Sequence, residues 1–136
     1  MSPEVIQRKL AMLIAYRADL EKTVSSGPIE DTHYAVERLF QLIVECMYDI
    51  ASHWLALRGD VHPDSYVEVF QEAGKKGLLA PVLASSLASA ARMRNLLVHV
   101  YERIDLGKIQ EAIPSLLADA QEFLRQVRKL SGGAAS

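Results

Sequence analysis

Cysteine is almost absent from this chain of 136 residues, which contains only Cys46. A single cysteine excludes an intramolecular disulfide and a multi-cysteine zinc site, and it fits a reducing, cytoplasmic setting. Long apolar runs are also missing, because no stretch approaches the roughly 18 apolar residues of a membrane span. The amino terminus, MSPEVIQRKLAM, lacks the apolar core and the cleavage site of a secretory signal. We therefore expect a cytoplasmic protein without a membrane segment.

The sequence also lacks the common short motifs of hydrolases and nucleotide-binding proteins. It has no glycine-rich phosphate loop, no H-E-x-x-H and no Gly-x-Ser-x-Gly. Hydrolysis by a serine triad or by a bound zinc ion therefore has no support. Metal-binding histidines are typically three or four residues apart, and no two histidines of this chain have that spacing, so we expect neither a metal ion nor a cofactor. The histidines are His33, His53, His62 and His99.

Acidic residues are scarce in one part of the chain. Between Lys75 and Lys108 six basic residues stand against two acidic ones, whereas the rest of the chain has nine basic and fifteen acidic residues. The net charge of −2 argues against a protein that coats nucleic acid. The uneven distribution is typical of a local phosphate-binding surface, but a chance cluster on solvated helix faces explains it equally well. Charge alone leaves both interpretations open.

Strand patterns are scarce, and apolar residues recur every three or four positions along most of the chain. This periodicity predicts helices that begin at Pro3, at Asp31 or Thr32, near Tyr66, at Pro81 and near Asp105. Their predicted ends are near Val24, at Arg58 before Gly59, at Gly74 or Gly77, near Tyr101 and near Leu130. Pro114 either kinks the last helix or marks its first turn.

The length and composition fit one domain with one core, since half of the residues are hydrophobic and about a quarter are charged. We predict an all-α fold, an antiparallel helical bundle of four main helices and one short helix. The domain is expected to span residues 1–130. The last residues, SGGAAS (131–136), are expected to be disordered.

One segment, RMRNLLVHVYERID (residues 92–105), places charged and titratable residues within an apolar helix. At about 100° per residue, Arg94 and Tyr101 share one helix face, whereas His99 is rotated by roughly 140° from Arg94. A single straight helix does not aim Arg94 and His99 at one atom. Three arrangements remain open: the helix is interrupted here, the long arginine wraps around it, or two copies of the segment meet at a dimer interface.

Arg94 and His99 together have the chemistry to act on a phosphodiester. A guanidinium offers forked donors to phosphate oxygens, and an imidazole titrates near neutral pH. RNA supplies its own nucleophile, because histidine can take the 2′-hydroxyl proton or donate a proton to the leaving oxygen. More ordinary roles fit the same residues: Arg94 with a buried stem and a solvated head, His99 as a half-buried histidine, and Tyr101 as a core aromatic. The residues alone leave both interpretations open.

The stretch RNLLVHVY (residues 94–101) matches without a gap the R-x4-H-x-Y motif of the HepT family. The chain thereby resembles the toxin half of HepT/MntA toxin–antitoxin pairs, within the HEPN superfamily of small helical domains. YAVERLFQLIVECMYDIASHWL (residues 34–55) is similar to the long second helix of that family, and the run from RNLLVHVYERID to EFLRQV is similar to its carboxy-terminal part. The likeness extends from Ile6 to about Leu130 and implies a HEPN-like helical bundle.

The resemblance implies a metal-independent endoribonuclease. Arg94 and His99 would be its catalytic pair, and Asn95 would help to orient the motif. Asp49 matches an acidic position in the second helix of the family, where it would hold Arg94 or set the protonation state of His99.

The resemblance also implies partners. Tyr101 would accept AMP from a minimal nucleotidyltransferase antitoxin of the MntA type, and the added charge and bulk would oppose RNA binding. The family is homodimeric, with the two motifs facing each other across the interface. Arg92 and Arg103, which flank the motif, are expected to contact RNA phosphates.

Two functions therefore stand as hypotheses. In the first, the protein is a ribonuclease toxin that a nucleotidyltransferase neutralises. In the second, it is a non-catalytic helical partner or substrate-positioning subunit of that nucleotidyltransferase, and Arg94 and His99 only contact nucleotide phosphates. A helical bundle with a buried histidine and no such role is a third interpretation, and it predicts that Arg94→Ala or Tyr101→Phe changes stability alone.

Overall fold

The computed structural model describes residues 3–59, 65–99 and 105–132. These residues contain five helices: α1 (Pro3–Ser25), α2 (Ile29–Leu57), α3 (Tyr66–Lys75), α4 (Pro81–His99) and α5 (Leu106–Gly132). No strand occurs in the described ranges, and no described helix combines the length and hydropathy needed to cross a bilayer. The predicted all-α fold of four long helices and one short helix is therefore confirmed.

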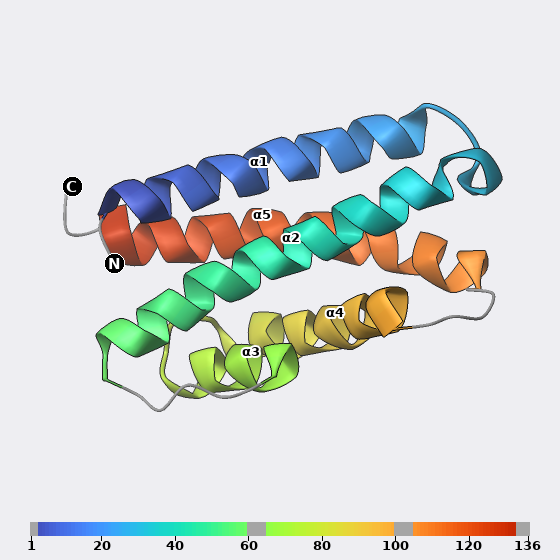
Figure 1. Cartoon of the computed structure of the whole chain (residues 1–136). Coiled ribbons are helices and arrows are strands. Elements are labelled where there is room, and N and C mark those ends of the chain that lie inside the picture. The colour runs from blue at the N-terminus through green and yellow to red at the C-terminus, as the bar shows by residue number, and fades with distance from the viewer. Residues whose placement is uncertain (1–2, 60–64, 100–104, 133–136) are drawn as a thin grey trace.

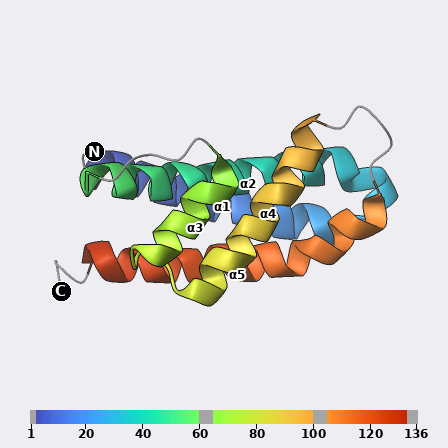
Figure 2. The same ribbon diagram turned by 90° about the horizontal axis from the view of Figure 1, so that it is seen from below.

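The helices form two groups. α1, α2 and α5 lie lengthwise along the molecule, with α1 antiparallel to α2 (Figure 1). α3 and α4 form an antiparallel hairpin that crosses α2 and α5 obliquely (Figure 2). Among the described residues α2 contacts all four other helices, whereas α1 contacts only α2 and α5. The α3–α4 hairpin therefore lies on the side of the bundle that faces away from α1.

One apolar core joins all five helices. Each helix contributes the apolar residues that recur every three or four positions on one of its faces. In α1 the buried residues Leu13 and Leu20 lie seven positions apart. In α5 the buried residues Ile109 and Leu116 have the same spacing. The largest fully buried side chains are Phe40, Phe70, Phe123, Leu13, Leu20, Ile43, Met47, Leu55, Leu79, Leu87, Ile109 and Leu116.

The first helix boundaries follow the predicted signals with one shift. Gly59 and Gly77 have φ angles of 76° and 86°, left-handed values that end the helical stretches before them. α2 begins at Ile29, two residues earlier than predicted. Pro28 precedes Ile29 with a φ of −68°, so the fixed proline ring leads the chain into the first turn without a capping side chain.

Of the later boundaries, the predicted start of the last helix near Asp105 is confirmed, and its end lies two residues beyond the predicted Leu130. α4 is described as far as His99, so its predicted end near Tyr101 lies outside the described residues. α5 begins after Asp105, whose Oδ1 accepts a hydrogen bond from the backbone N of Gly107 at 2.9 Å. α5 continues to Gly132, so the first two residues of the segment predicted to be disordered are helical. No proline stands there to stop an established helix, and residues 133–136 lie outside the description.

Pro114 lies well inside α5 and not in its first turn. Proline lacks the N–H that a helix interior requires, and its ring clashes with the preceding turn, so it bends the helix. The amino-terminal part of α5 indeed bends away from the rest of that helix (Figure 2). Of the two roles predicted for Pro114, the structure supports the kink.

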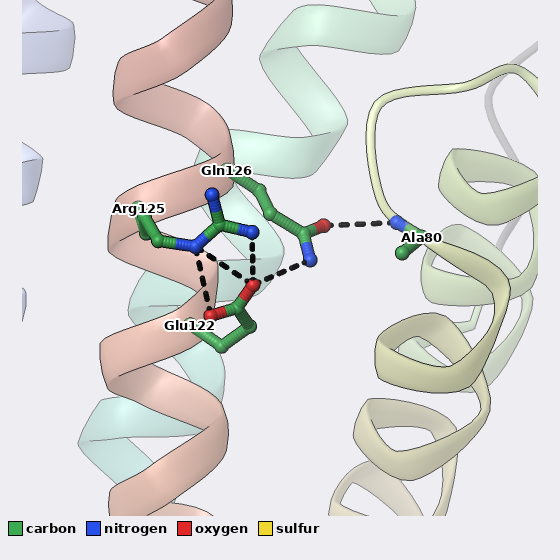
Figure 3. A network of polar contacts seen from close by, with 4 residues as sticks. All are labelled: Ala80, Glu122, Arg125 and Gln126. Carbon is green, nitrogen blue, oxygen red and sulfur yellow. Dashed lines mark hydrogen bonds and ion pairs between the residues drawn. The ribbon is translucent and has the colours of Figure 1, made fainter.

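Side-chain hydrogen bonds link the start of α4 to the carboxy-terminal part of α5 (Figure 3). Gln126 Oε1 accepts a hydrogen bond from the backbone N of Ala80 at 2.8 Å, immediately before α4 begins. Gln126 Nε2 donates to Glu122 Oε1 at 3.0 Å, and Arg125 Nε donates to both Glu122 oxygens. Backbone N–H groups at a helix start have no intrahelical acceptor, so Gln126 supplies one from the neighbouring helix.

Polar contacts also hold α1 in place. Arg17 Nε donates to the carbonyl oxygen of Leu117 in α5 at 2.8 Å. Cys46 Sγ donates to the carbonyl oxygen of Lys9 at 3.1 Å. Burial raises the pKa of the Cys46 thiol to about 11, so this cysteine stays a protonated core residue at neutral pH.

Gly74→Ala is expected to destabilise the α3–α4 hairpin. A Cβ at position 74 would lie 2.6 Å from the Cβ of Ala84, and both atoms are attached directly to a helix backbone. The helices must separate, and such overpacking costs about 1–3 kcal/mol of unfolding free energy. The double variant Gly74→Ala/Ala84→Gly removes the opposing methyl group and should recover part of the loss. Urea unfolding followed by circular dichroism measures both; a Gly74→Ala midpoint equal to that of the wild type would contradict this packing.

Candidate active site

Arg94 lies where α4 faces α2 and the start of α3. Leu83 and Leu87 precede it by eleven and seven residues, so Arg94 continues the face of α4 that carries these two buried leucines. A charged residue at the end of a buried face needs a polar partner on the helix opposite. α2 and α3 provide that partner and an aromatic neighbour.

The Arg94 guanidinium contacts three side chains. Its Nε and Nη2 donate to the same oxygen of Glu45 at 3.3 and 3.1 Å, and its Nη1 donates to Asn95 Oδ1 at 3.2 Å. Its Cζ lies 4.2 Å from the ring centroid of Tyr66. The Arg94 side chain is only 16% exposed and that of Glu45 29%. The head of Arg94 is thus packed and paired, which differs from the solvated head of an ordinary surface arginine.

Two stacked tyrosines lie beside the guanidinium. The rings of Tyr48 in α2 and Tyr66 in α3 have centroids 4.0 Å apart and an interplanar angle of 14°. Burial raises the pKa of Tyr66, while the positive charge of Arg94 acts in the opposite direction. The Tyr66 phenol is therefore neutral at physiological pH, and its ring face is available to the cation.

Asp49 pairs with a different helix from the one predicted. Its Oδ2 accepts a hydrogen bond from Lys9 Nζ of α1 at 3.1 Å. Arg94 pairs instead with Glu45, one turn earlier on α2. The reason is geometric: α4 meets α2 at Glu45, whereas Asp49 lies within reach of α1. A role of Asp49 in setting the protonation state of His99 stays a prediction.

The rest of the motif is described only in part. His99 is the last described residue of α4, without its side chain, and Tyr101 and Arg103 lie outside the described residues. α4 is continuous from Arg94 to His99, which excludes an interruption between them. The two positions therefore diverge by about 140° on one helix. A wrapped arginine and a second copy of the chain remain as ways to combine them.

Arg92 does not join Arg94. It is exposed on another face of α4, where it and Lys75 line a groove of about 500 Å³ between α3 and α4. Of the predicted site residues, the structure thus brings together Arg94 and Asn95 and places Arg92 apart from them. Within the described ranges no three histidine, cysteine, aspartate or glutamate residues are grouped as metal ligands would be.

Glu45, Tyr48 and Tyr66 complete the Arg94 cluster and were not among the predicted residues. Tyr48 and Asp49 follow Glu45 by three and four residues on α2, so both lie next to Glu45 on the helix surface. That spacing indicates from the sequence that these side chains are neighbours. It does not indicate which of the two carboxylates, Glu45 or Asp49, pairs with α4. For Tyr66 the sequence has no such signal, because it reaches Arg94 only through the packing of α3.

The helical arrangement defines the class of this chain, a small all-α domain. A sequence model of the family described as ribonuclease HepT-like matches residues 6–127. The chain therefore belongs to the HepT-like ribonuclease family. A protein of Aphanizomenon flos-aquae (strain 2012/KM1/D3) named tRNA nuclease HepT is 30% identical over 132 residues, which cover 93% of this chain and 90% of that relative.

Two solved structures have the same fold. One is a tri-AMPylated HEPN toxin of Shewanella oneidensis in complex with an MNT antitoxin, with a TM-score of 0.84 and 20% identity over 94% of this chain and 98% of that one. The other is a toxin–antitoxin structure with AMP-PNP, with a TM-score of 0.84 and 19% identity over 92% of this chain and 98% of that one. These likenesses confirm the predicted HEPN-like bundle.

Glu45→Gln is expected to lower the free energy of unfolding by about 1–3 kcal/mol, because a mostly buried guanidinium loses its charged acceptor. Asp49→Asn on the same helix is the matched control. Its ion pair with Lys9 is more exposed, 45% on the aspartate side, so its loss should stay below about 1 kcal/mol. Chemical denaturation of both variants measures the difference. A larger loss in Asp49→Asn would show that Glu45 is not the principal partner of Arg94.

Proposed function

We propose that this chain is a metal-independent endoribonuclease toxin that cleaves cellular RNA with Arg94 and His99. The packed guanidinium of Arg94 within an R-x4-H-x-Y motif is the observation that carries the proposal. An arginine that only covers a helix surface keeps its head in water, whereas Glu45 and Tyr66 hold this one in a fixed orientation. The name of the relative, tRNA nuclease HepT, supports RNA as the substrate class.

The proposed reaction uses the nucleophile of the RNA itself. The neutral imidazole of His99 takes the proton of a ribose 2′-hydroxyl, and the 2′-oxygen attacks the adjacent phosphorus. The bond from phosphorus to the 5′-oxygen breaks, and that oxygen receives a proton from an imidazolium. The products are a 2′,3′-cyclic phosphate and a 5′-hydroxyl end. Arg94 stabilises the negative charge that develops on the phosphoryl oxygens.

The contacts of Arg94 suit this role. Three of its five N–H groups donate to Glu45 and Asn95, which leaves two for phosphate oxygens. Glu45 fixes the orientation of the guanidinium but also offsets its charge. Arg94 is therefore suited to directional hydrogen bonds in the transition state, and the long-range attraction of RNA falls to other basic residues, among them Arg92 and Arg103.

The proposed enzyme is a homodimer. Positions 94 and 99 diverge on a continuous α4, so a second copy provides a way to bring both side chains to one phosphate. Val82 and Leu96 lie fourteen residues apart on one face of α4 and are 84% and 56% exposed. Leu96 lies within the motif, and an exposed apolar side chain there is a contact that a second copy would cover.

The proposed partner is a minimal nucleotidyltransferase antitoxin of the MntA type, which attaches AMP to Tyr101. The description of one structural relative as a tri-AMPylated toxin in complex with an MNT antitoxin supports this regulation. Each adenylate brings a negative phosphate and a bulky base next to the motif. Both oppose the entry of a polyanion, so modification should prevent RNA binding.

Induction of the wild-type chain in a bacterial host should arrest growth and degrade RNA, and Arg94→Ala and His99→Ala should do neither at equal soluble levels. With purified proteins in the presence of EDTA, each substitution should slow cleavage by at least about 100-fold. The exposed Arg8→Ala in α1 serves as a control and should cleave like the wild type. If the purified wild type cuts no RNA yet binds the nucleotidyltransferase, the non-catalytic partner function replaces the ribonuclease.

Tyr101→Phe should remain toxic and escape neutralisation. The variant keeps the ring and loses only the hydroxyl that would accept AMP. Co-expression of an MntA-type nucleotidyltransferase should therefore rescue growth of cells with the wild-type chain but not of cells with the variant. Intact mass spectrometry should detect adenylate on the wild type alone. Adenylate at an unchanged level on Tyr101→Phe would place the modification on another residue.

A further inference from the structure

The α3–α4 groove, about 500 Å³ in volume, lies on the other side of α4 from the contact between Arg94 and α2. α3 and α4 approach closely beside it, because Gly74 leaves no Cβ in the way of Ala84. Polar side chains from both helices line the groove, namely Gln71, Lys75, Ser85 and Arg92. These four side chains all carry groups that donate hydrogen bonds.

The charge of the α3–α4 groove is of one sign. Two cations line it and no carboxylate does. Lys75 Nζ lies 3.8 Å from Glu72 Oε1, in an exposed pair between neighbouring turns. Such a pair contributes little, so an incoming anion can displace it. Arg92 is exposed and lines the groove, so its guanidinium is accessible to a ligand.

The groove leads to the predicted catalytic histidine. Positions 85, 92 and 99 are seven residues apart on the uninterrupted α4, so they share one helix face. Successive positions of this set are separated by about 10 Å along the helix axis. A chain of phosphates that follows the groove from Ser85 to Arg92 therefore continues toward position 99. An acidic protein docked on this surface would have no reason to be aligned with that position.

We propose that the α3–α4 groove is a subsite for the phosphodiester backbone of single-stranded RNA, with Lys75 and Arg92 binding phosphates next to the one that is cleaved. The inference rests on the proposed ribonuclease function. Since Glu45 offsets the charge of Arg94, the cations of the groove supply attraction that the catalytic arginine does not. Lys75 and Arg92 contact phosphates and not base edges, so they add affinity without sequence preference.

The test measures binding of a short fluorescein-labelled single-stranded RNA by fluorescence anisotropy, in a His99→Ala background that cannot cut it. Lys75→Ala/Arg92→Ala should weaken binding by at least about tenfold. It should also reduce the slope of log affinity against log salt by about 1.4, the value for two lost phosphate contacts on a single strand. Lys75→Arg/Arg92→Lys keeps both charges and should bind almost like the parent.

Arg8→Ala/Lys22→Ala is the matched control, because it removes two exposed cations from α1, which makes no contact with α3 or α4 in the described residues. It should change affinity less than about twofold at physiological salt. Thermal melting by circular dichroism verifies that every variant is folded.

The outcomes separate this inference from the proposed function. If the groove variant binds RNA as tightly as its parent, with the same salt slope, while the wild type cuts RNA, the subsite is wrong and the ribonuclease stands. If the groove variant loses only its affinity for the nucleotidyltransferase, the surface serves that protein and the subsite is again wrong. If the parent binds no RNA and the wild type cuts none, both are wrong.

Discussion

The pairing of Arg94 with Glu45 is the contact around which α2, α3 and α4 are arranged. A guanidinium that is only 16% exposed costs free energy unless its N–H groups are paired. Glu45 of α2 and Asn95 of α4 pair them, and Tyr66 of α3 covers one face of the cation. Three helices therefore meet at one charge. Their meeting also fixes how α4 is rotated about its own axis.

That rotation gives the two sides of α4 different surroundings. Arg94 continues the buried face of Leu83 and Leu87 toward α2. Positions 85 and 92 border the α3–α4 groove, and the exposed Leu96 lies about 40° from position 92 around the helix. Small residues make the arrangement feasible, because Gly74 lets α3 approach α4 without displacing it. The contact of Arg94 with α2 is thus separated from the α3–α4 groove on a single helix.

Local signals predicted most of the fold and only part of the site. Periodicity and turn residues such as Pro81 and Gly59 depend on the chain within a few residues, and they located the helices. Ion pairs between helices depend on where the helices cross, and the periodicity of one helix holds no information about that crossing point. Glu45 and Asp49 are equivalent on the face of α2 until α4 and α1 are in place, when the first meets Arg94 and the second Lys9. Sequence alone could only suggest that an acid on this helix holds the arginine.

The same contacts discriminate between the two remaining ways to combine Arg94 with His99. To wrap around α4, the arginine would have to leave both Glu45 and Tyr66. Loss of a charge-assisted hydrogen-bonded pair and of a cation–π contact costs on the order of 2–4 kcal/mol. It would also leave Glu45 without its partner. A second copy requires no such loss, and the exposed Leu96 lies about 60° from position 99 around the helix. The exposed Leu96 near the histidine position thus fits the proposed homodimer, in which Arg94 would be held in place before substrate arrives.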